Sequence, residues 1–312
     1  MKKLGIIGAM QQEVETLLRV LEDRKTETRG GCTFYAGKLE GLDVVIVQCG
    51  VGKVNAAMCA QILCDRYEVT HIVNTGIAGS LCAELDIGDL VVSKDAMYHD
   101  FDCVHFGYEM GRVPGMDVAA FPADKMMMDY AFAAAEAVNP GHTKVGRVAS
   151  GDLFVAEKSA KNAIIEKTGA LCTEMEGAAI AHAAYKNGVP FVILRAISDK
   201  ADDSAEMDYP TFENIAAHRC AAVTRMLAKS IYEANRTNQI IYGRVRVCLF
   251  LVYLKRMILQ SKQRSFDWRK MRSRWFRSPV KTCCTRMTAK SAESPFFPQT
   301  LRGRSLRTRK KA

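Results

Sequence analysis

Near its start the chain reads Leu4-Gly5-Ile6-Ile7-Gly8-Ala9-Met10-Gln11-Gln12-Glu13, a short apolar run that is closed by glycine and followed by polar residues. The run is shorter than a signal peptide needs and leads to no cleavage pattern, so it predicts a buried first strand. The next segment, Glu13–Leu21, places its Val and Leu side chains on one stripe at helical spacing. A buried strand followed directly by an amphipathic helix is typical of an α/β fold.

The same alternation continues to about residue 230. Short runs rich in Val and Ile, typical of strands that are buried on both faces, are Leu4–Ile7, Val44–Gln48, Ile72–Asn74, Leu90–Ser93, Val145–Ser150 and Phe191–Ile197. Amphipathic stretches with helical spacing lie between or after them at Lys53–Tyr67, Met126–Val138, Gly177–Asn187 and Thr211–Leu227. The sequence therefore predicts a three-layer α/β/α fold around a central, twisted sheet that is mostly parallel or mixed.

Charge is divided unevenly along the chain. The net charge is +10, but residues 231–312 carry 21 Lys and Arg against 3 Asp and Glu, whereas residues 1–230 carry 23 against 31. Within the basic part, Lys281–Ala312 shows no sustained periodicity. We therefore expect a folded domain over residues 1–230 and a basic, poorly ordered C-terminal extension over residues 231–312, with the boundary near 230–236.

Two readings of this extension remain open. Its stretch Lys262–Arg277 interleaves basic residues with Phe266, Trp268, Trp275 and Phe276, a pattern that suits a nucleic-acid-binding accessory. The abrupt change of composition is equally expected of a segment that arose by a change of reading frame. Its most apolar part, Ile240–Leu259, is interrupted by four basic residues, so we expect no membrane span.

Metal and redox chemistry find little support in the sequence. The eleven cysteines are an odd number and form no C-x-x-C pair, which indicates free thiols in a reducing cytoplasm. His99, His105 and His182 lack the spacing of metal ligands, and we interpret them as structural. We expect neither a metal nor a cofactor.

Carboxylates follow several of the predicted strands. Glu13 follows the first strand, Glu174 and Glu176 precede a small-residue helix, and Asp199 follows Phe191–Ile197. Ligands of α/β folds bind at the carboxyl ends of strands, so these residues are candidates for acid–base chemistry. Each one taken alone is equally well explained as a helix N-terminal carboxylate.

Two glycine-rich turns also follow strands, at Gly50-Val51-Gly52 and at Asn74–Gly79. Neither is a dinucleotide-binding or P-loop motif, because G-x-G-x-x-G and G-x-x-x-x-G-K-[ST] are both absent. Such turns serve either tight packing or the approach of backbone N–H groups to a ligand.

Six motifs stand in order along the first 230 residues: Gly5–Val14, Cys49–Ala57, Asn74–Gly79, Ser150–Phe154, Thr173–Ala179 and Arg195–Asp199. Together they resemble the bacterial 5′-methylthioadenosine/S-adenosylhomocysteine nucleosidases of the purine nucleoside phosphorylase superfamily. Each motif alone is shared across the superfamily, whereas the combination of the first with the last two is more specific. The extension after about residue 230 has no counterpart in this family.

The resemblance implies a nucleoside phosphorylase/hydrolase-like fold and hydrolysis of the N-glycosidic bond of methylthioadenosine, adenosylhomocysteine and 5′-deoxyadenosine. Adenine is released, which serves methionine salvage and methyl-cycle recycling. The implied partners are a thio-nucleoside, water and a second copy of the chain.

Roles for individual residues follow from the resemblance. Asp199 matches the acid that protonates adenine N7, Glu13 the residue that deprotonates water, and Glu176 the carboxylate that binds the ribose hydroxyls. The implied substrate-binding residues are Met10, Val51, Ile77, Gly79, Phe154, Val155, Met175, Arg195, Ser198 and Tyr209. The implied loop that closes the 5′-thio pocket of a partner subunit contains Cys103, Phe106, Tyr108 and Pro114.

The chain departs from the family at three of these positions. Ile77 stands where some members carry Ser, which puts one hydrogen bond near the ribose in doubt. Cys103 and Tyr209 replace Val and Phe, which bears on the 5′ substituent.

A phosphorylase on the same fold is the alternative. It would bind phosphate through arginines near the first glycine loop, but Gly8–Glu13 contains no Arg and ends in a carboxylate. The sequence therefore favours water as the nucleophile.

Overall fold

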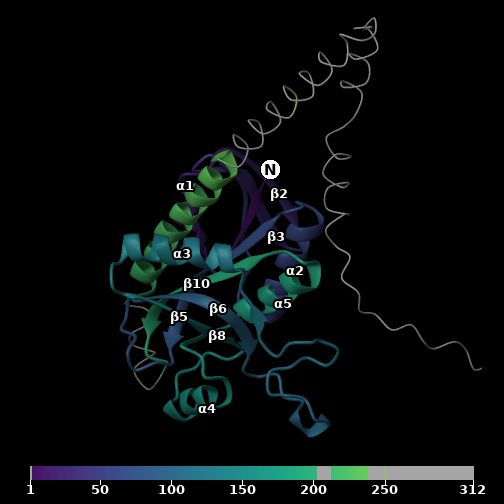
Figure 1. The fold of residues 1–312 in the computed structure, drawn as a ribbon, viewed down its shortest axis with the longest axis vertical. Coiled ribbons are helices and arrows are strands. Elements are labelled where there is room, and N and C mark those ends of the chain that lie inside the picture. Colours follow the sequence, from purple (N-terminus) through teal and green to yellow (C-terminus); the bar gives the residue numbers. More distant parts are fainter. Residues whose placement is uncertain (1, 202–211, 238–249, 251–312) are drawn as a thin grey trace, which may run out of the picture. The chain divides into compact units, whose positions relative to one another are not determined.

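The computed structural model (Figure 1) describes residues 2–201, 212–237 and 250. The chain divides into two compact units, Met1–Gly243 and Arg244–Ala312, and the described residues other than Phe250 belong to the first. Tyr209 and the aromatic residues of the predicted nucleic-acid-binding stretch lie outside the described residues.

Helices and strands alternate along the first unit. The strands are β1 Lys3–Gly8, β2 Glu22–Arg29, β3 Cys32–Leu39, β4 Leu42–Gln48, β5 His71–Ser80, β6 Leu90–Tyr98, β7 Phe121–Pro122, β8 Thr143–Ser150, β9 Cys172–Glu174 and β10 Phe191–Asp199. The helices are α1 Gln11–Arg19, α2 Lys53–Asp65, the 3₁₀ turn η1 Val104–Phe106, α3 Lys125–Val138, α4 Lys158–Thr168 and α5 Gly177–Asn187. Residues 212–237 form a further helix.

All of these strands belong to one ten-stranded mixed sheet, in the order β10-β6-β8-β9-β5-β1-β4-β3-β2 with β7 beside β6. Strand β10 pairs in parallel with β5 and also antiparallel with β6. Pairing therefore runs in a closed circuit through β5, β9, β8, β6 and β10. This closure brings the ends of strands that are distant in the sequence to one place.

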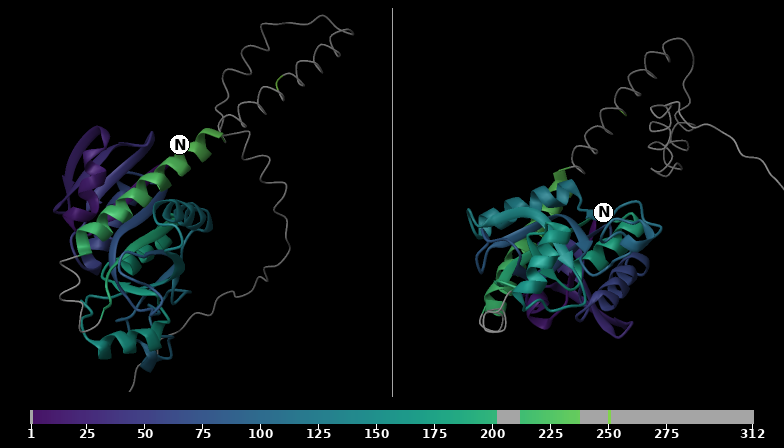
Figure 2. Two further views of the ribbon diagram at one scale, coloured as in Figure 1. Left: turned by 90° about the vertical axis from the view of Figure 1, so that its left-hand side faces the viewer. Right: turned by 90° about the horizontal axis from the view of Figure 1, so that it is seen from below.

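Helices cover both faces of the sheet (Figures 1 and 2). On one face, α2 and α5 pack with strand side chains such as Ile7, Val45 and Ile72. On the other face, α1, α3 and the helix 212–237 pack with Leu4, Ile6 and other strand side chains of opposite alternation. The predicted three-layer α/β/α fold with a mixed sheet is confirmed.

Some helices and strands of the structure were not predicted from the sequence. The hairpin of β2 and β3 extends the sheet at its edge, and β2 is almost wholly exposed and charged. Helix α4 and the short strands β7 and β9 were also not predicted. No helix in residues 2–201 and 212–237 is long and apolar enough to cross a membrane.

The helix 212–237 packs against the rest of the unit from Ala216 to Ile231. Ala217 and Ala221 are fully buried, as small residues must be where a helix lies close to a sheet. Ile231 is also buried, Arg225 pairs with Glu40 at 2.6 Å, and the Tyr232 ring lies over Gly41. The predicted boundary near 230–236 lies close to Ile231, the last buried residue of this helix, and the compact unit ends at Gly243.

We expect a chain that ends after Gly243 to unfold at the same temperature as the full-length chain and to keep its activity. A chain that ends after Ser230 should unfold at a lower temperature, because it loses the buried Ile231 side chain, and burial of such a side chain is worth about 1.5–3 kcal/mol. Circular dichroism melts of the three chains measure this.

An unfolded 1–243 chain would show that the domain needs residues after Gly243. The same three chains should be titrated with mixed DNA and RNA at low and high salt. Tight binding by the full-length chain alone that persists at high salt would assign a nucleic-acid-binding role to the extension.

Candidate active site

Glu13 lies where β1 passes into α1, and its carboxylate turns back over that junction. Glu13 Oε2 accepts hydrogen bonds from the backbone N–H groups of Ala9 (2.6 Å) and Met10 (2.9 Å), and Oε1 accepts one from Ile77 (3.1 Å). The side chain is only 4 % exposed. Three convergent N–H groups beside a helix N-terminus form an anion-binding arrangement, and here the chain's own carboxylate occupies it.

Burial raises the pKa of Glu13, because removal from water disfavours the charged carboxylate. The positive charge of Arg195 and the three N–H donors act in the opposite direction without cancelling the rise. The approach is close: a Cβ atom on Gly76 would overlap Glu13 Oε1, so this position of β5 requires glycine. Glu13 is thus a carboxyl group with an increased ability to accept a proton.

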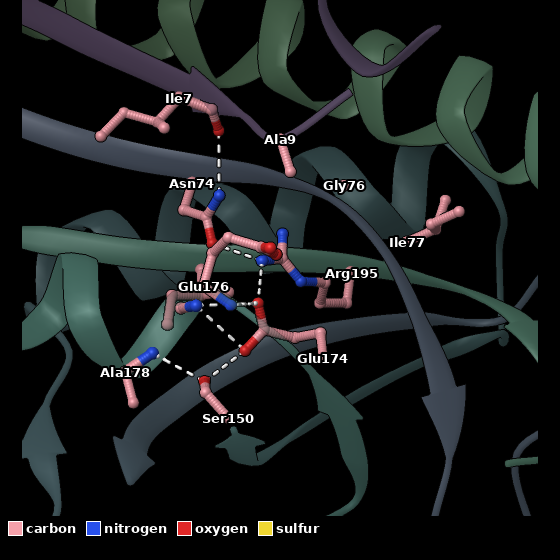
Figure 3. A network of polar contacts seen from close by, with 12 residues as sticks. Ile7, Ala9, Asn74, Gly76, Ile77, Ser150, Glu174, Glu176, Ala178 and Arg195 are labelled. Carbon is pink, nitrogen blue, oxygen red and sulfur yellow. Dashed lines mark hydrogen bonds and ion pairs between the residues drawn. The ribbon is translucent and has the colours of Figure 1, made fainter. Parts of the chain in front are cut away.

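Arg195 is the side chain that connects the site. It lies on β10 directly opposite Gly76 of β5 and is 2 % exposed. Its Nη2 donates to Asn74 Oδ1 and to Glu174 Oε2, and its Nη1 donates to the Leu194 carbonyl at 3.1 Å (Figure 3). Asn74 is itself held by a bond from its Nδ2 to the Ile7 carbonyl at 2.9 Å.

Glu174 and Glu176 are two residues apart, but their surroundings shift their pKa values in opposite directions. Burial disfavours the charge on Glu174, yet Arg195, the Ser150 hydroxyl and the Gly177 N–H outweigh it and lower its pKa. Burial and then the negative charge of Glu174 raise the pKa of Glu176 to about 8. The Gly52 N–H donates to Glu176 Oε1 at 2.8 Å and moderates that rise.

This divergence indicates a functional site, because carboxylates with opposed pKa values can hold different protonation states at the same pH. Sequence reasoning named Glu174 as a candidate carboxylate and Arg195 as a binding residue, but it missed the ion pair between them and the two polar residues that support this pair. Ser150 donates to Glu174 and accepts from the Ala178 N–H at 2.7 Å (Figure 3), and Asn74 orients Arg195. Both missed residues, Ser150 and Asn74, stand inside the motifs that carry the family resemblance, which was the available signal.

Asp199 ends β10 and lies opposite Gly79 of β5, after an irregularity in the pairing. It is buried, and it accepts hydrogen bonds from the Ser198 hydroxyl (2.7 Å) and the Ala201 N–H (2.8 Å). A Cβ atom on Gly79 would lie 2.8 Å from Asp199 Oδ1, so glycine is required here too. The predicted residues Asp199, Ser198 and Gly79 therefore form one contact group.

The other predicted binding residues lie on the surrounding loops, except Ile77, which lies within β5. Phe154 is 47 % exposed, Val51 is exposed beside Gly52, and Met10 and Met175 are half-buried. The Val155 side chain is buried in a small cluster with Leu81 and Ile164. The Ile77 side chain packs into the core, while its N–H serves Glu13.

The predicted partner-pocket residues lie on the loop between β6 and β7, around η1. Phe106 is 80 % exposed and Pro114 is exposed, while Cys103 and Tyr108 are half-buried. Among the histidines predicted to be structural, His182 stacks on Phe121. The described part of the chain holds no group of three or more His, Cys, Asp or Glu residues arranged for a metal ion.

Comparison with known proteins shows which family this chain is similar to. The family model described as "Phosphorylase superfamily" matches residues 3–229. The 5′-methylthioadenosine/S-adenosylhomocysteine nucleosidase of Chromohalobacter salexigens is 39 % identical over 236 residues, which cover 75 % of this chain and all of that protein.

Two solved structures are similar along the same region. The 5′-methylthioadenosine/S-adenosylhomocysteine nucleosidase of Neisseria meningitidis, in complex with methylthio-immucillin-A, has a TM-score of 0.72 at 35 % identity and covers 74 % of this chain and 100 % of that one. The nucleosidase of Colwellia psychrerythraea, in complex with adenine, has a TM-score of 0.70 at 38 % identity and covers 73 % of this chain and 94 % of that one.

We expect Glu176→Gln to raise the melting temperature at alkaline pH and to leave it nearly unchanged at pH 4. The pKa of Glu176 is raised when the chain folds, so its stabilising contribution is complete below its unfolded value and is lost as the pH rises to about 8. A glutamine avoids the cost of the buried charge. Thermal melts between pH 4 and pH 9 measure the difference.

The matched control is Glu166→Gln, which changes an exposed carboxylate on α4. A difference between Glu176→Gln and the unmodified chain that stays constant across this pH range would show that Glu176 ionises normally.

Proposed function

This chain belongs to the phosphorylase superfamily and, within it, to the 5′-methylthioadenosine/S-adenosylhomocysteine nucleosidases, and we propose that it hydrolyses the N-glycosidic bond of both nucleosides. Water adds across the bond between ribose C1′ and adenine N9. The oxygen joins C1′ and the bonding electrons leave with adenine, which is released. The same chemistry extends to 5′-deoxyadenosine, which differs only at the 5′ end.

The position of Glu13 is the main support for hydrolysis over phosphorolysis. A phosphorylase must hold a phosphate anion against C1′, and for that it needs convergent donors. In this chain the N–H groups of Ala9, Met10 and Ile77 already donate to the Glu13 carboxylate. The guanidinium of Arg195 is taken up by Glu174 and Asn74. Donors already engaged by a carboxylate favour a neutral nucleophile, which is water.

Glu13 is suited to deprotonate that water. Its raised pKa gives it a higher proton affinity than an exposed glutamate, which general base catalysis requires. Arg195, held rigidly between Asn74 and Glu174, limits this rise and orients the carboxylate. The water attacks C1′ as the bond to adenine breaks.

Asp199 supplies the opposite half of the reaction. A purine anion is a poor leaving group, so a proton must reach adenine N7 as the C1′–N9 bond breaks. The Ser198 hydroxyl and the Ala201 N–H fix the Asp199 carboxyl at the end of β10. Acid and base on opposite sides of the sugar follow the general logic of glycoside hydrolysis.

Glu176 binds the ribose hydroxyls. Phe154 stacks on adenine, and the Val155 backbone contacts the purine edge. The thioribose side is formed by Met10, Met175, Val51 and Tyr209, the last of which lies outside the described residues.

The chain works as a homodimer in which the loop between β6 and β7 closes the 5′-thio pocket of the partner subunit. The exposed Phe106 and the half-exposed Val104 support this, because apolar side chains on a loop tip are typical of contact surfaces. The cysteines of the described region are unpaired, which suits a cytoplasmic location.

We expect adenine release from methylthioadenosine to be independent of phosphate. The test is to incubate the purified chain with methylthioadenosine in phosphate-free buffer and with added phosphate, and to identify the sugar product. Free methylthioribose in both conditions is the expected result. A sugar 1-phosphate that forms only with phosphate would reassign the chain to the phosphorylases.

We expect Asp199→Asn to lower kcat by ~10²–10⁴-fold while substrate still binds, because proton delivery matters mainly in the transition state. Glu13→Gln should behave likewise, whereas Glu176→Gln should lose affinity as well as kcat, because the ribose is held in the ground state too. Steady-state kinetics and equilibrium binding of a non-hydrolysable substrate analogue separate these effects. Turnover of Asp199→Asn near that of the unmodified chain would refute the acid role.

A further inference from the structure

The two loops assigned to ribose and adenine are tied together by one side chain that no catalytic role explains. Asp152 follows β8 and stands two residues before Phe154. Its Oδ1 accepts a hydrogen bond of 2.8 Å from the backbone N–H of Lys53, the first residue of α2. Its Oδ2 lies 3.7 Å from Lys53 Nζ. A residue of the adenine loop thus contacts the helix that begins at the ribose loop.

This contact completes the start of α2. The residue before the helix is Gly52, which has no side chain to accept a hydrogen bond from the first turn. An acceptor at this place stabilises a helix, and a carboxylate there also interacts favourably with the helix dipole. Asp152, from a distant part of the chain, provides both the hydrogen-bond acceptor and the negative charge.

The neighbouring N–H group of the same turn serves the catalytic machinery. Gly52 N–H donates to Glu176 Oε1 at 2.8 Å, one residue before the N–H that donates to Asp152. Two carboxylates therefore hold two successive N–H groups of one helix start. A displacement of Lys53 N–H from Asp152 also moves Gly52 N–H relative to Glu176.

Asp100 holds Asp152 in place from the other side. Asp100 Oδ2 accepts from Lys53 Nζ at 2.5 Å and from the backbone N–H of Asp152 at 3.0 Å. Burial opposes ionisation of Asp100, but these two donors outweigh it and lower its pKa. Lys53, Asp100 and Asp152 form a closed three-membered network, which orders its members better than an isolated surface pair does.

Two glycines beside this network could not carry a side chain without a clash or backbone strain. A Cβ atom on Gly151 would overlap the buried His99 ring, and one on Gly52, whose φ is +100°, would lie 3.2 Å from Asp152 Oδ1. The close approach of Gly52 to Asp152 indicates that the two loops lie close to each other, and Gly151 places the adenine loop closely against His99, which follows β6.

We propose that Asp152 is a positioning residue, which fixes the ribose loop and the adenine loop relative to each other through the Lys53 N–H group and Asp100. It acts on the reaction through Gly52 N–H and Glu176 on one side and through Phe154 on the other. This inference rests on the proposed function, which assigns ribose to Glu176 and adenine to Phe154.

The test compares Asp152→Ala, Asp152→Asn and Asp152→Glu in the full-length chain. Asparagine keeps an acceptor for Lys53 N–H, since Asn and Asp are equally good at helix starts. Alanine removes the acceptor, and glutamate keeps the charge but displaces it by one methylene. We expect Asp152→Ala and Asp152→Glu to lower kcat/KM for methylthioadenosine by about 10- to 100-fold, with a lower kcat and a higher KM. The kcat/KM of Asp152→Asn should stay near that of the unmodified chain.

The pH dependence distinguishes positioning from a merely structural role. Loss of the Gly52 N–H contact removes one group that lowers the pKa of Glu176, so the limb of the kcat/KM profile near pH 8 should move upward in Asp152→Ala and not in Asp152→Asn. The matched control is Asp129→Ala, which breaks an exposed Lys–Asp pair on α3.

Melting temperatures of all variants are measured in parallel. If Asp152→Ala does not fold, the kcat/KM of Asp152→Glu is compared with that of Asp152→Asn, and this comparison tests the same proposal. The proposal is overturned if Asp152→Ala or Asp152→Glu has the same kcat/KM as the unmodified chain and the limb of its kcat/KM profile near pH 8 stays at the same pH. Failure of the unmodified chain to release adenine would instead refute the proposed function.

Discussion

The buried ion pair of Arg195 with Glu174 is the interaction on which the site depends. Removing both groups from water is costly, and hydrogen bonds to the two groups offset part of that cost. Here Glu174 also accepts from Ser150 and Gly177, and Arg195 donates to Asn74 and the Leu194 carbonyl. Loss of one partner from a buried pair costs about 3–5 kcal/mol, because the other charge is left uncompensated.

The pair also sets the protonation of its neighbours. The charge of Arg195 lowers the pKa of Glu13, Glu174 and Glu176, but only in Glu174 does this outweigh burial. Glu174 therefore stays ionised, and its negative charge helps to raise the pKa of Glu176. Burial raises the pKa of Glu13 against the effect of Arg195, and burial together with the charge of Glu174 raises the pKa of Glu176. These two carboxyl groups are the ones to which the proposed mechanism assigns work on water and ribose.

Much of this arrangement could be predicted from the sequence where the signal is local. Helix α5 occupies the predicted span Gly177–Asn187, because its small residues pack closely and Gly188 ends it in a left-handed conformation. Strand β2 could not be predicted, since Glu22–Arg29 contains only charged residues and two threonines, as suits an exposed sheet edge that must not pair with another chain. The role of Asn74 depends on the register of β5 with β10, and the role of Glu174 depends on the register of β9 with β8, which places it opposite Ser150. No single segment encodes these registers.

The register of β5 and β10 explains why the site exists at this place in the sheet. Gly76 lies opposite Arg195 and Gly79 opposite Asp199, so each glycine stands across from a functional side chain. Glycine weakens a strand, and its presence there commonly marks a close approach. A Cβ atom at either position would meet the carboxylate of Glu13 or Asp199. The alternation of β5 is therefore shaped by two carboxylates that must reach the backbone, and burial of every residue of β5 compensates for the glycines.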